Sequence, residues 1–261
     1  MKILCVGDVV GEAGRHALED LLAGIKEEFQ IEFVIVNGEN AAGGAGLTPR
    51  IADQLMRAGT DVLTLGDHVW DRPELVEYLQ EKKHIVRPAN FPKDTPGKGW
   101  SVATAKSGRK IGVINLLGRV FMRYNVDCPF RKLSEILSEL KRETNIVVVD
   151  FHTEATSEKV AFGLFSDGQV SAVVGTHTHI QTADEKILPK GTAYITDLGM
   201  SGPYDSVIGQ DKDKIIERFL TSRPVRFEVA KNDITLCGVV VDVDENTGLA
   251  NQIIRLQRRK Q

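Results

Sequence analysis

KILCVGD, residues 2–8, is an apolar run that stops at a glycine and a carboxylate. The pattern returns as EFVIVNGEN at residues 32–40 and as DVLTLGDH at residues 61–68. Short runs of Ile, Val and Leu bounded by turn residues are typical of buried strands. Helical periodicity at Glu12–Phe29 and a helix start at Thr48-Pro49 separate the three runs. This alternation predicts a βαβαβ unit and an α/β fold.

The rest of the chain adds further strands and helices. After a short helix beyond Pro73 and a proline-marked loop, strands are predicted at Trp100–Ala105, Lys110–Leu116, Ile146–Phe151 and Val170–Val174, with helices at Arg131–Arg142 and from Thr156. The tail has predicted strands at Ala193–Thr196, Val225–Val229, Thr235–Val243 and Ile253–Leu256, and a helix near Asp211–Leu220. This run of late strands predicts a second sheet packed against the first. We expect one domain over residues 1–261.

Composition narrows the class of protein. A chain of 261 residues with 42% hydrophobic residues can bury a substantial core. The net charge of -3 gives no long-range attraction to nucleic acid or to an anionic membrane, although a local basic patch would escape this average. The three cysteines have no CxxC spacing, and no apolar stretch approaches membrane-spanning length. We therefore expect a soluble, cytoplasmic protein without disulfides.

Five short segments hold nearly all residues that could bind a metal ion, and each follows a predicted strand. They are Gly7-Asp8, Gly38-Glu39-Asn40, Gly66-Asp67-His68, Asp150-Phe151-His152 and Gly175-Thr176-His177-Thr178-His179. In a largely parallel sheet the carboxyl ends of strands share one edge, so these segments should converge. Carboxylate, amide and imidazole donors suit Zn, Mn, Fe or Co, and seven ligands are too many for one ion. The set predicts two ions bridged by a carboxylate.

The single segments carry less weight than the set. Asp8 alone could be a turn or helix-cap residue, and Glu39-Asn40 alone is more typical of a solvated turn. His177 and His179 form the strongest pair, because a spacing of two places both on one face of a regular strand. His152 and His68 taken alone are as compatible with ordinary hydrogen bonding as with a metal site.

In the order of these five segments the chain resembles the calcineurin-like metallophosphoesterases, which share the motif order GD, GEN, G(N)H, H and GTHTH. The stretches ILCVGDVVGEAGR, VIVNGENAAGGAGLT, DFHTEATSEK and VVGTHTHIQTAD resemble the bacterial YmdB-type branch in particular. The resemblance runs from Lys2 to about Gln257. It implies a two-sheet β-sandwich flanked by helices, in four αββα layers. It also implies a phosphodiesterase that acts on cyclic nucleotides, with 2′,3′-cyclic AMP as a substrate and 3′,5′-cyclic AMP as a further candidate.

The resemblance also assigns ligands. Asp8, Glu39, Asn40 and His179 would hold one ion, and Glu39 would bridge to a second ion held by Asp67, His152 and His177. Iron is the first expectation, in a divalent or mixed-valence pair, with manganese or zinc as alternatives. One position departs from the family, which usually has asparagine where this chain has Asp67. A carboxylate there should bind metal more tightly and reduce its Lewis acidity.

The mechanism expected from this site is attack on phosphorus by a hydroxide held between the two ions. The resemblance assigns His68 to general-acid or transition-state duty, whereas an outer hydrogen bond is the simpler role. Residues around the ligands are expected to orient the histidines by hydrogen bonds, as ligating imidazoles generally require; the candidates are Thr153, Glu154, Thr182 and Asp184.

Two other classes of function remain open from the sequence. A phosphomonoesterase or nuclease would use the same metals with different pocket walls. A non-catalytic binder of phosphate or RNA would keep the metal for structure, and Asp67 makes this interpretation conceivable. We expect a homo-oligomer and no membrane partner.

Overall fold

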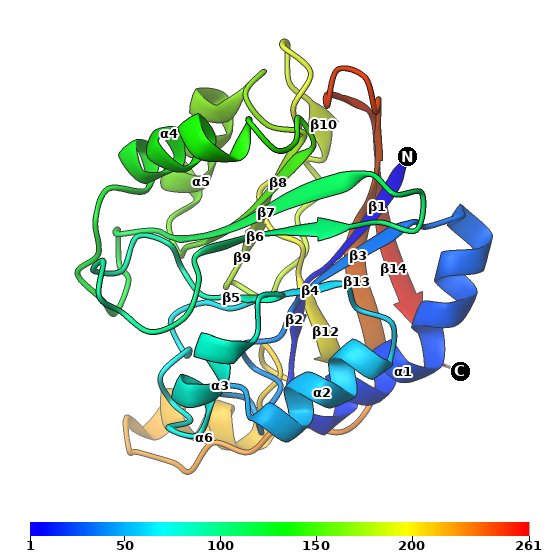
Figure 1. Cartoon of the computed structure of the whole chain (residues 1–261). Helices are drawn as coiled ribbons and strands as arrows, with labels where there is room; N and C mark the ends of the chain where they lie inside the picture. The colour runs from blue at the N-terminus through cyan, green and yellow to red at the C-terminus, as the bar shows by residue number, and fades with distance from the viewer. Residues whose placement is uncertain (261) are drawn as a thin grey trace.

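The computed structural model describes residues 1–260 and arranges them in four layers, with two sheets face to face and helices outside each (Figure 1). The first sheet has the strand order β2-β12-β13-β1-β3-β4-β5, with β14 paired to β13, and the second has the order β10-β11-β9-β8-β7-β6. This arrangement confirms the expected two-sheet α/β fold flanked by helices.

The first sheet is built from both ends of the chain. Its strands are β1 (Lys2–Val6), β2 (Asp8–Val9), β3 (Phe33–Asn37), β4 (Val62–Thr64), β5 (Ile85–Val86), β12 (Met200–Pro203), β13 (Ile234–Val243) and β14 (Ala250–Arg259). Strands β1, β3, β4 and β5 run parallel, whereas β13 pairs antiparallel with β1. The helices over this sheet are α1 (Gly11–Phe29), α2 (Pro49–Arg57) and α3 (Leu75–Glu81). Thr48 caps α2 by accepting a hydrogen bond from the Ile51 amide.

The second sheet comes from the middle of the chain. Its strands are β6 (Trp100–Thr104), β7 (Lys110–Leu117), β8 (Val147–His152), β9 (Ala172–Thr176), β10 (Lys186–Ile187) and β11 (Ala193–Ile195). Strands β7, β8, β9 and β11 run parallel, so their carboxyl ends lie at one edge. Helices α4 (Pro129–Leu140) and α5 (Thr156–Ser166) cover its outer face.

Alternation along the strands divides the core into three layers. In β1, Leu4 and Val6 pack beneath the helices of the first sheet, whereas Ile3 and Cys5 face the second sheet. Because successive strand side chains point to opposite faces, one continuously apolar strand serves two core layers. The third layer lies between the second sheet and helices α4 and α5.

The expected placement of the late strands is wrong in two respects. Strands β13 and β14 extend the first sheet beside β1, and the second sheet is formed chiefly by residues 100–176. Residues 225–229 form no strand and make a single bridge, between Gln210 and Val229. Their alternating pattern indicated a strand, but they lie in a segment where no neighbouring strand offers a ladder of partners.

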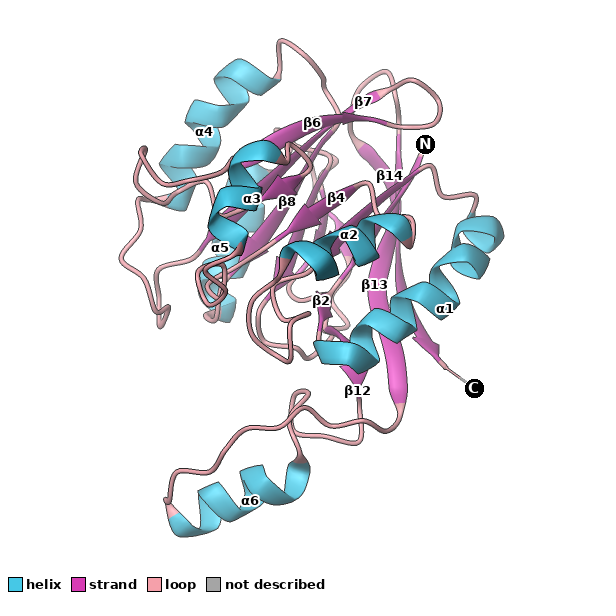
Figure 2. Cartoon of the chain, turned by 60° about the horizontal axis from the view of Figure 1, so that its bottom comes forward, coloured by secondary structure: helices cyan, strands magenta, loops and turns pink. Residues whose placement is uncertain are grey.

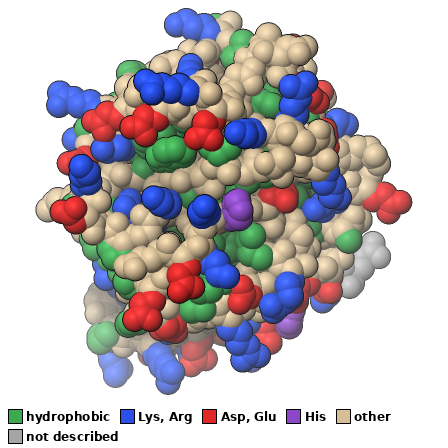
Figure 3. Space-filling view, in the orientation of Figure 1, with side chains coloured by type: hydrophobic (Ala, Val, Ile, Leu, Met, Phe, Trp, Pro, Cys, Tyr) green, Lys and Arg blue, Asp and Glu red, His purple; other side chains and the backbone are tan. Residues whose placement is uncertain are grey.

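Helix α6 (Lys212–Thr221) projects away from the layered body (Figure 2). Phe219 and Leu220 at its end are 80% and 81% exposed. In the described part of the chain, no helix is long and apolar enough to cross a membrane. Acidic and basic side chains alternate over the face seen in Figure 3, in keeping with the small net charge.

Candidate metal centre

Both sheets contribute residues to the predicted metal site. Asp8 opens β2, Glu39 and Asn40 lie in the turn after β3, and Asp67 lies in the turn after β4. His152 is the last residue of β8 in the second sheet, and β9 ends just before His177. The expected edge of a single parallel sheet is therefore replaced by the adjoining edges of two sheets.

Four of the predicted ligands form a compact cluster, which we call the inner cluster: Glu39, Asp67, His152 and His177. One ligand atom from each lies within 4.8 Å of the others. The Nε2 atom of His152 lies 3.0 Å from Glu39 Oε1 and 3.2 Å from Asp67 Oδ1, and 3.0 Å from His177 Nδ1. Convergence of two imidazole nitrogens and two carboxylates at this spacing suits a borderline divalent cation.

The other three predicted ligands, Asp8, Asn40 and His179, form what we call the outer group. Asn40 Nδ2 lies 3.3 Å from His179 Nε2 and donates a hydrogen bond to Glu39 Oε1 at 3.0 Å. Glu39 thus lies between the inner cluster and the outer group. The Oδ1 atom of Asp8 is buried and has no hydrogen-bond partner among residues 1–260. A buried carboxylate oxygen without a partner is costly, so it fits a metal ligand.

One ring nitrogen of each predicted histidine ligand lies close to an oxygen atom of a residue that is not a predicted ligand. Thr176 Oγ1 donates to Asp150, so it accepts from His152 Nδ1, at 2.8 Å. His177 Nε2 lies 3.3 Å from Glu154 Oε2. His179 Nδ1 donates to the Ile208 carbonyl at 2.9 Å. These partners fix the ring tautomers and leave His152 Nε2, His177 Nδ1 and His179 Nε2 for a metal.

The expectation that His177 and His179 share one face of a strand is wrong. Both residues follow β9 and have positive φ angles, 98° for His177 and 65° for His179. The left-handed backbone turns the two rings apart. His177 therefore joins the inner cluster and His179 approaches Asn40.

Charge and burial shift the pKa values of the site in opposite directions. Burial raises the pKa of Asp8 to about 7, although nearby His152 opposes the rise. Burial lowers the pKa of His152, but Glu39, Asp67 and Asp8 outweigh it and hold that pKa well above its usual value. Burial acts to raise the pKa of Asp67, but hydrogen bonds to His152 and His177 overcome it and keep that pKa far below the usual range. The excess of carboxylates favours a bound cation.

Asp150, which belongs to one of the five segments, holds the two sheets together beneath the site. Its carboxylate accepts hydrogen bonds from Asn37 at 2.9 Å and from Thr176 at 2.6 Å, and also from Thr64. These partners come from β3, β9 and β4, so both sheets meet at this carboxylate. No role was predicted for Asp150, whose signal in the sequence was an aspartate two residues before His152 at the end of an apolar run.

Gly66 is required by the close approach of the inner cluster. A Cβ atom at this position would lie 2.0 Å from Glu39 Oε2 and 2.4 Å from His152 Nε2. Any side chain here would therefore displace two predicted ligands.

His68 lies at the border of the inner cluster. Its amide donates to Glu39 Oε2 at 3.3 Å, and its Nδ1 lies 2.8 Å from Asp71 Oδ2. Arg123 holds the other oxygen of Asp71 at 2.9 Å. Burial lowers the pKa of His68, but Glu39 and Asp71 raise it above its usual value overall. Asp71 was not singled out in the sequence, although its spacing of three residues from His68 in a turn was a usable signal.

Of the residues predicted to orient the histidines, one contacts a histidine and the others contact different groups. Glu154 binds His177, as described above, whereas the Thr153 hydroxyl donates to Glu158 at 3.0 Å. Thr182 exchanges hydrogen bonds with the backbone of Asp197, and Asp184 accepts from Thr196. Thr182 and Asp184 thus hold backbone, and Thr153 holds the Glu158 carboxylate.

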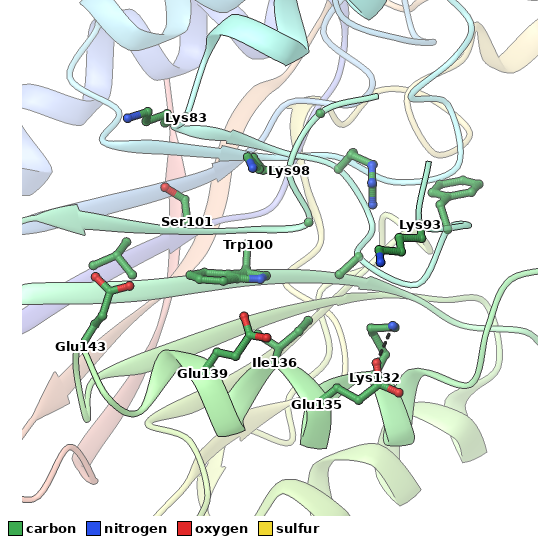
Figure 4. Close-up of a pocket in the computed structure, with 16 residues that line it drawn as sticks. Lys83, Lys93, Lys98, Trp100, Ser101, Lys132, Glu135, Ile136, Glu139 and Glu143 are labelled. Carbon is green, nitrogen blue, oxygen red and sulfur yellow. Dashed lines mark hydrogen bonds and ion pairs between the residues drawn. The ribbon is translucent and has the colours of Figure 1, made fainter. Parts of the chain in front are cut away.

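A cavity of about 820 Å³ lies between α4 and the loop before β6 (Figure 4). Lys83 and Lys98 lie on one side of Trp100, and Glu139 on α4 and Glu143 in the turn after it lie on the other. The cavity shares no lining residue with the predicted metal site. Its lining contains no histidine, in contrast to the inner cluster.

Comparison with known proteins assigns the chain to a family. A sequence model of the YmdB-like proteins matches residues 4–256. The chain belongs to the YmdB-like family. A relative from Bacillus subtilis strain 168, named as a 2′,3′-cyclic-nucleotide 2′-phosphodiesterase, is 50% identical over 256 residues, which cover 98% of this chain and 96% of the relative.

Two solved structures are similar over the whole YmdB-like chain. A hypothetical protein from Thermus thermophilus has a TM-score of 0.93 and 39% identity, with 100% of both chains covered. A phosphatase from Mycoplasma pneumoniae has a TM-score of 0.92 and 38% identity, and the match covers 99% of this chain and 93% of that one.

Proposed function

We propose that this chain is a metal-dependent phosphoric diester hydrolase that acts on 2′,3′-cyclic nucleotides. The observation that carries the proposal is the convergence of His152 Nε2 and His177 Nδ1 on Glu39 and Asp67, with the opposite ring nitrogens already bound elsewhere. The name of the Bacillus subtilis relative supports the substrate class. 3′,5′-Cyclic AMP is a second candidate substrate.

The donor set supports two metal ions. The inner cluster would hold one ion and the outer group the other, with Glu39 between them. Mixed nitrogen and oxygen donors without a thiolate suit iron, manganese or zinc. When bound, such ions supply hydroxide near neutral pH and offset charge on the phosphoryl oxygens.

The protein's own part in the reaction is to orient the phosphate and to supply a proton. A water oxygen forms the new bond to phosphorus, the bond from phosphorus to a ribose oxygen breaks, and that oxygen takes up a proton. His68 is the proposed donor, because Asp71 binds its Nδ1 and Nε2 is then the ring nitrogen that can give up a proton. A raised pKa keeps this ring protonated nearer to neutral pH.

The cytoplasmic location and self-association expected from the sequence remain part of the proposal. The exposed Phe219 and Leu220 of α6 are the first surface to alter in a test of self-association. Light scattering of the F219S/L220S variant would then give a smaller mass than the unaltered chain.

The decisive experiment combines elemental analysis with hydrolysis assays. The purified chain should contain two metal ions and should hydrolyse 2′,3′-cyclic AMP, with 3′,5′-cyclic AMP assayed in parallel. His68→Ala should retain the metals and lose about 100-fold in kcat, the lower range for general acid catalysis. His84→Ala, an exposed histidine outside the site, is the matched control.

Other outcomes separate the alternatives. Turnover of nucleoside monophosphates or short RNA without cyclic nucleotides would favour a phosphomonoesterase or nuclease. A metal-loaded chain without turnover of any of these substrates would favour a non-catalytic phosphate or RNA binder. Full activity in His68→Ala would remove the proposed proton donor.

A further inference from the structure

The loop that carries His177 and His179 adopts an unfavourable backbone conformation on both sides of Thr178. His177 and His179 both lie in the left-handed region, at φ angles of 98° and 65°. Non-glycine residues rarely adopt this conformation unless surrounding contacts impose it. Contacts of Thr178, which lies between the two histidines, hold the loop in this conformation.

Thr178 is anchored by Asp197. The amide and the hydroxyl of Thr178 both donate to Asp197 Oδ2, at 3.2 Å and 2.7 Å. The other oxygen, Oδ1, accepts from the Gly199 amide at 2.8 Å. Asp197 is fully buried, so its charge needs compensation.

The compensating charge comes from α5. Lys159 Nζ lies 2.6 Å from Asp197 Oδ2, and Lys159 is only 1% exposed. Its Cδ atom passes beside Gly175, where an added Cβ would lie 3.1 Å from it and 1.8 Å from the Thr196 carbonyl oxygen. Gly175 thus lets the lysine reach Asp197 beneath the histidine loop.

The preceding residue on α5 provides a natural comparison. The Glu158 carboxylate accepts hydrogen bonds from the amides of Arg119 and Val120, and from the Thr153 hydroxyl. Consecutive residues of the motif TSEK therefore fasten two different loops. The loop of Arg119 and Val120 carries no predicted metal ligand, whereas the Lys159–Asp197 pair supports a loop that carries two.

We propose that Lys159 and Asp197 are positioning residues that hold His177 and His179 ready for metal binding. The inference rests on the proposed metal site but not on the substrate. Because the loop is anchored at Thr178, loss of the pair releases both histidines at once. Metal should then bind more weakly at both the inner cluster and the outer group.

The test uses the double variant K159M/D197N, which removes both charges and leaves no buried unpaired ion. Mn²⁺ affinity, measured by calorimetry on the metal-free protein, should fall about 10- to 100-fold, the range for residues that orient metal ligands. The visible spectrum of the Co²⁺-loaded variant should also change, because this spectrum reports the ligands and their geometry. Circular dichroism would establish that the variant is folded.

Glu158→Gln is the matched control, since it weakens a buried anchor on the same helix turn. It should leave Mn²⁺ affinity and the Co²⁺ spectrum unchanged. Equal losses in both variants would overturn the proposal, because they would indicate general loosening of α5. Unchanged metal binding in a folded K159M/D197N variant would overturn it as well. Both readouts are independent of phosphodiesterase activity, so failure of the proposed substrate would leave this test intact.

Discussion

The inner cluster and the outer group differ in how far the protein has already assembled them. In the inner cluster, His152 Nε2 lies within about 3 Å of Glu39, Asp67 and His177. In the outer group, Asp8 Oδ1 has no hydrogen-bond partner in the described chain, and His179 meets only an amide nitrogen of Asn40 at the site. The protein thus preorganises one half of the site more completely than the other. Two metal affinities should follow, with the inner cluster binding first.

The largest effect should come from removing the centre of the inner cluster. His152→Ala deletes the nitrogen that touches Glu39 and Asp67, and removes the buried cation partner that these two carboxylates share. We expect loss of more than about 100-fold in kcat, above the range for residues that merely orient ligands. Elemental analysis should find no more than one metal ion in each chain. Two retained ions in this variant would show that the inner cluster is misassigned.

A smaller and more selective effect should come from the outer group. His179→Ala removes one predicted ligand and its bond to the Ile208 carbonyl, but it leaves the inner cluster intact. One ion should remain per chain, with activity reduced about 10- to 100-fold. A Mn²⁺ titration should lose its weaker step and keep its tighter one. Loss of the tighter step would reverse the comparison between the two halves.

Asp67→Asn tests the expected departure from the family pattern. The carboxylate adds negative charge beside His152 and His177, so the amide should weaken metal binding in the inner cluster. We expect about a 10-fold lower Mn²⁺ affinity, the low end for changes near a metal, and a higher kcat at saturating metal. The measurement is kinetics at fixed metal content. Identical kinetics would mean that the substitution has no consequence for turnover.

The fold was largely predictable from local patterns, whereas long-range pairing was not. The apolar runs at residues 2–6 and 33–37 gave the first strands because buried parallel strands need little beyond continuous hydrophobicity. That β13 would insert beside β1 could not be predicted, because the two strands are more than 200 residues apart and no local signal specifies their pairing. Periodicity likewise indicated a strand at residues 225–229 but carried no information on neighbours.

The candidate site was predictable as a set of strand ends but not as a geometry. Strand-end position located the seven predicted ligands, whereas their division into two groups depends on the backbone of His177 and His179. Asp150 was missed as the tie between the sheets because its partners Asn37, Thr64 and Thr176 are distant in sequence. Such hydrogen bonds exist only after the sheets have packed.

The smallest expected effect is a pH dependence of the stability of the metal-free protein, which distinguishes the outer group from the inner cluster. Burial raises the pKa of Asp8 from an ordinary 3.8 to about 7 in the folded metal-free chain, and the pKa of His152 is also raised. A group whose pKa is higher in the folded than in the unfolded chain stabilises the fold at pH values below its unfolded pKa. This stabilisation is lost as pH rises through the folded pKa. The lowered pKa values of Glu39 and Asp67 act only in more acidic solution.

The metal-free protein should therefore lose thermal stability as pH rises from about 5 through the Asp8 pKa of about 7, and further as pH rises through the raised pKa of His152. We expect its Tm to fall by at least about 2 °C, the shift that about 1 kcal/mol produces in a chain of this size. Added Mn²⁺ should stabilise more at the upper end of this range, because binding requires ionised Asp8 and neutral His152. Asp8→Asn should remove part of the pH dependence of Tm in the metal-free protein. The substitution abolishes the titration of Asp8 in the outer group and leaves the titration of His152. If the full dependence persists in Asp8→Asn, the titration belongs to the inner cluster alone.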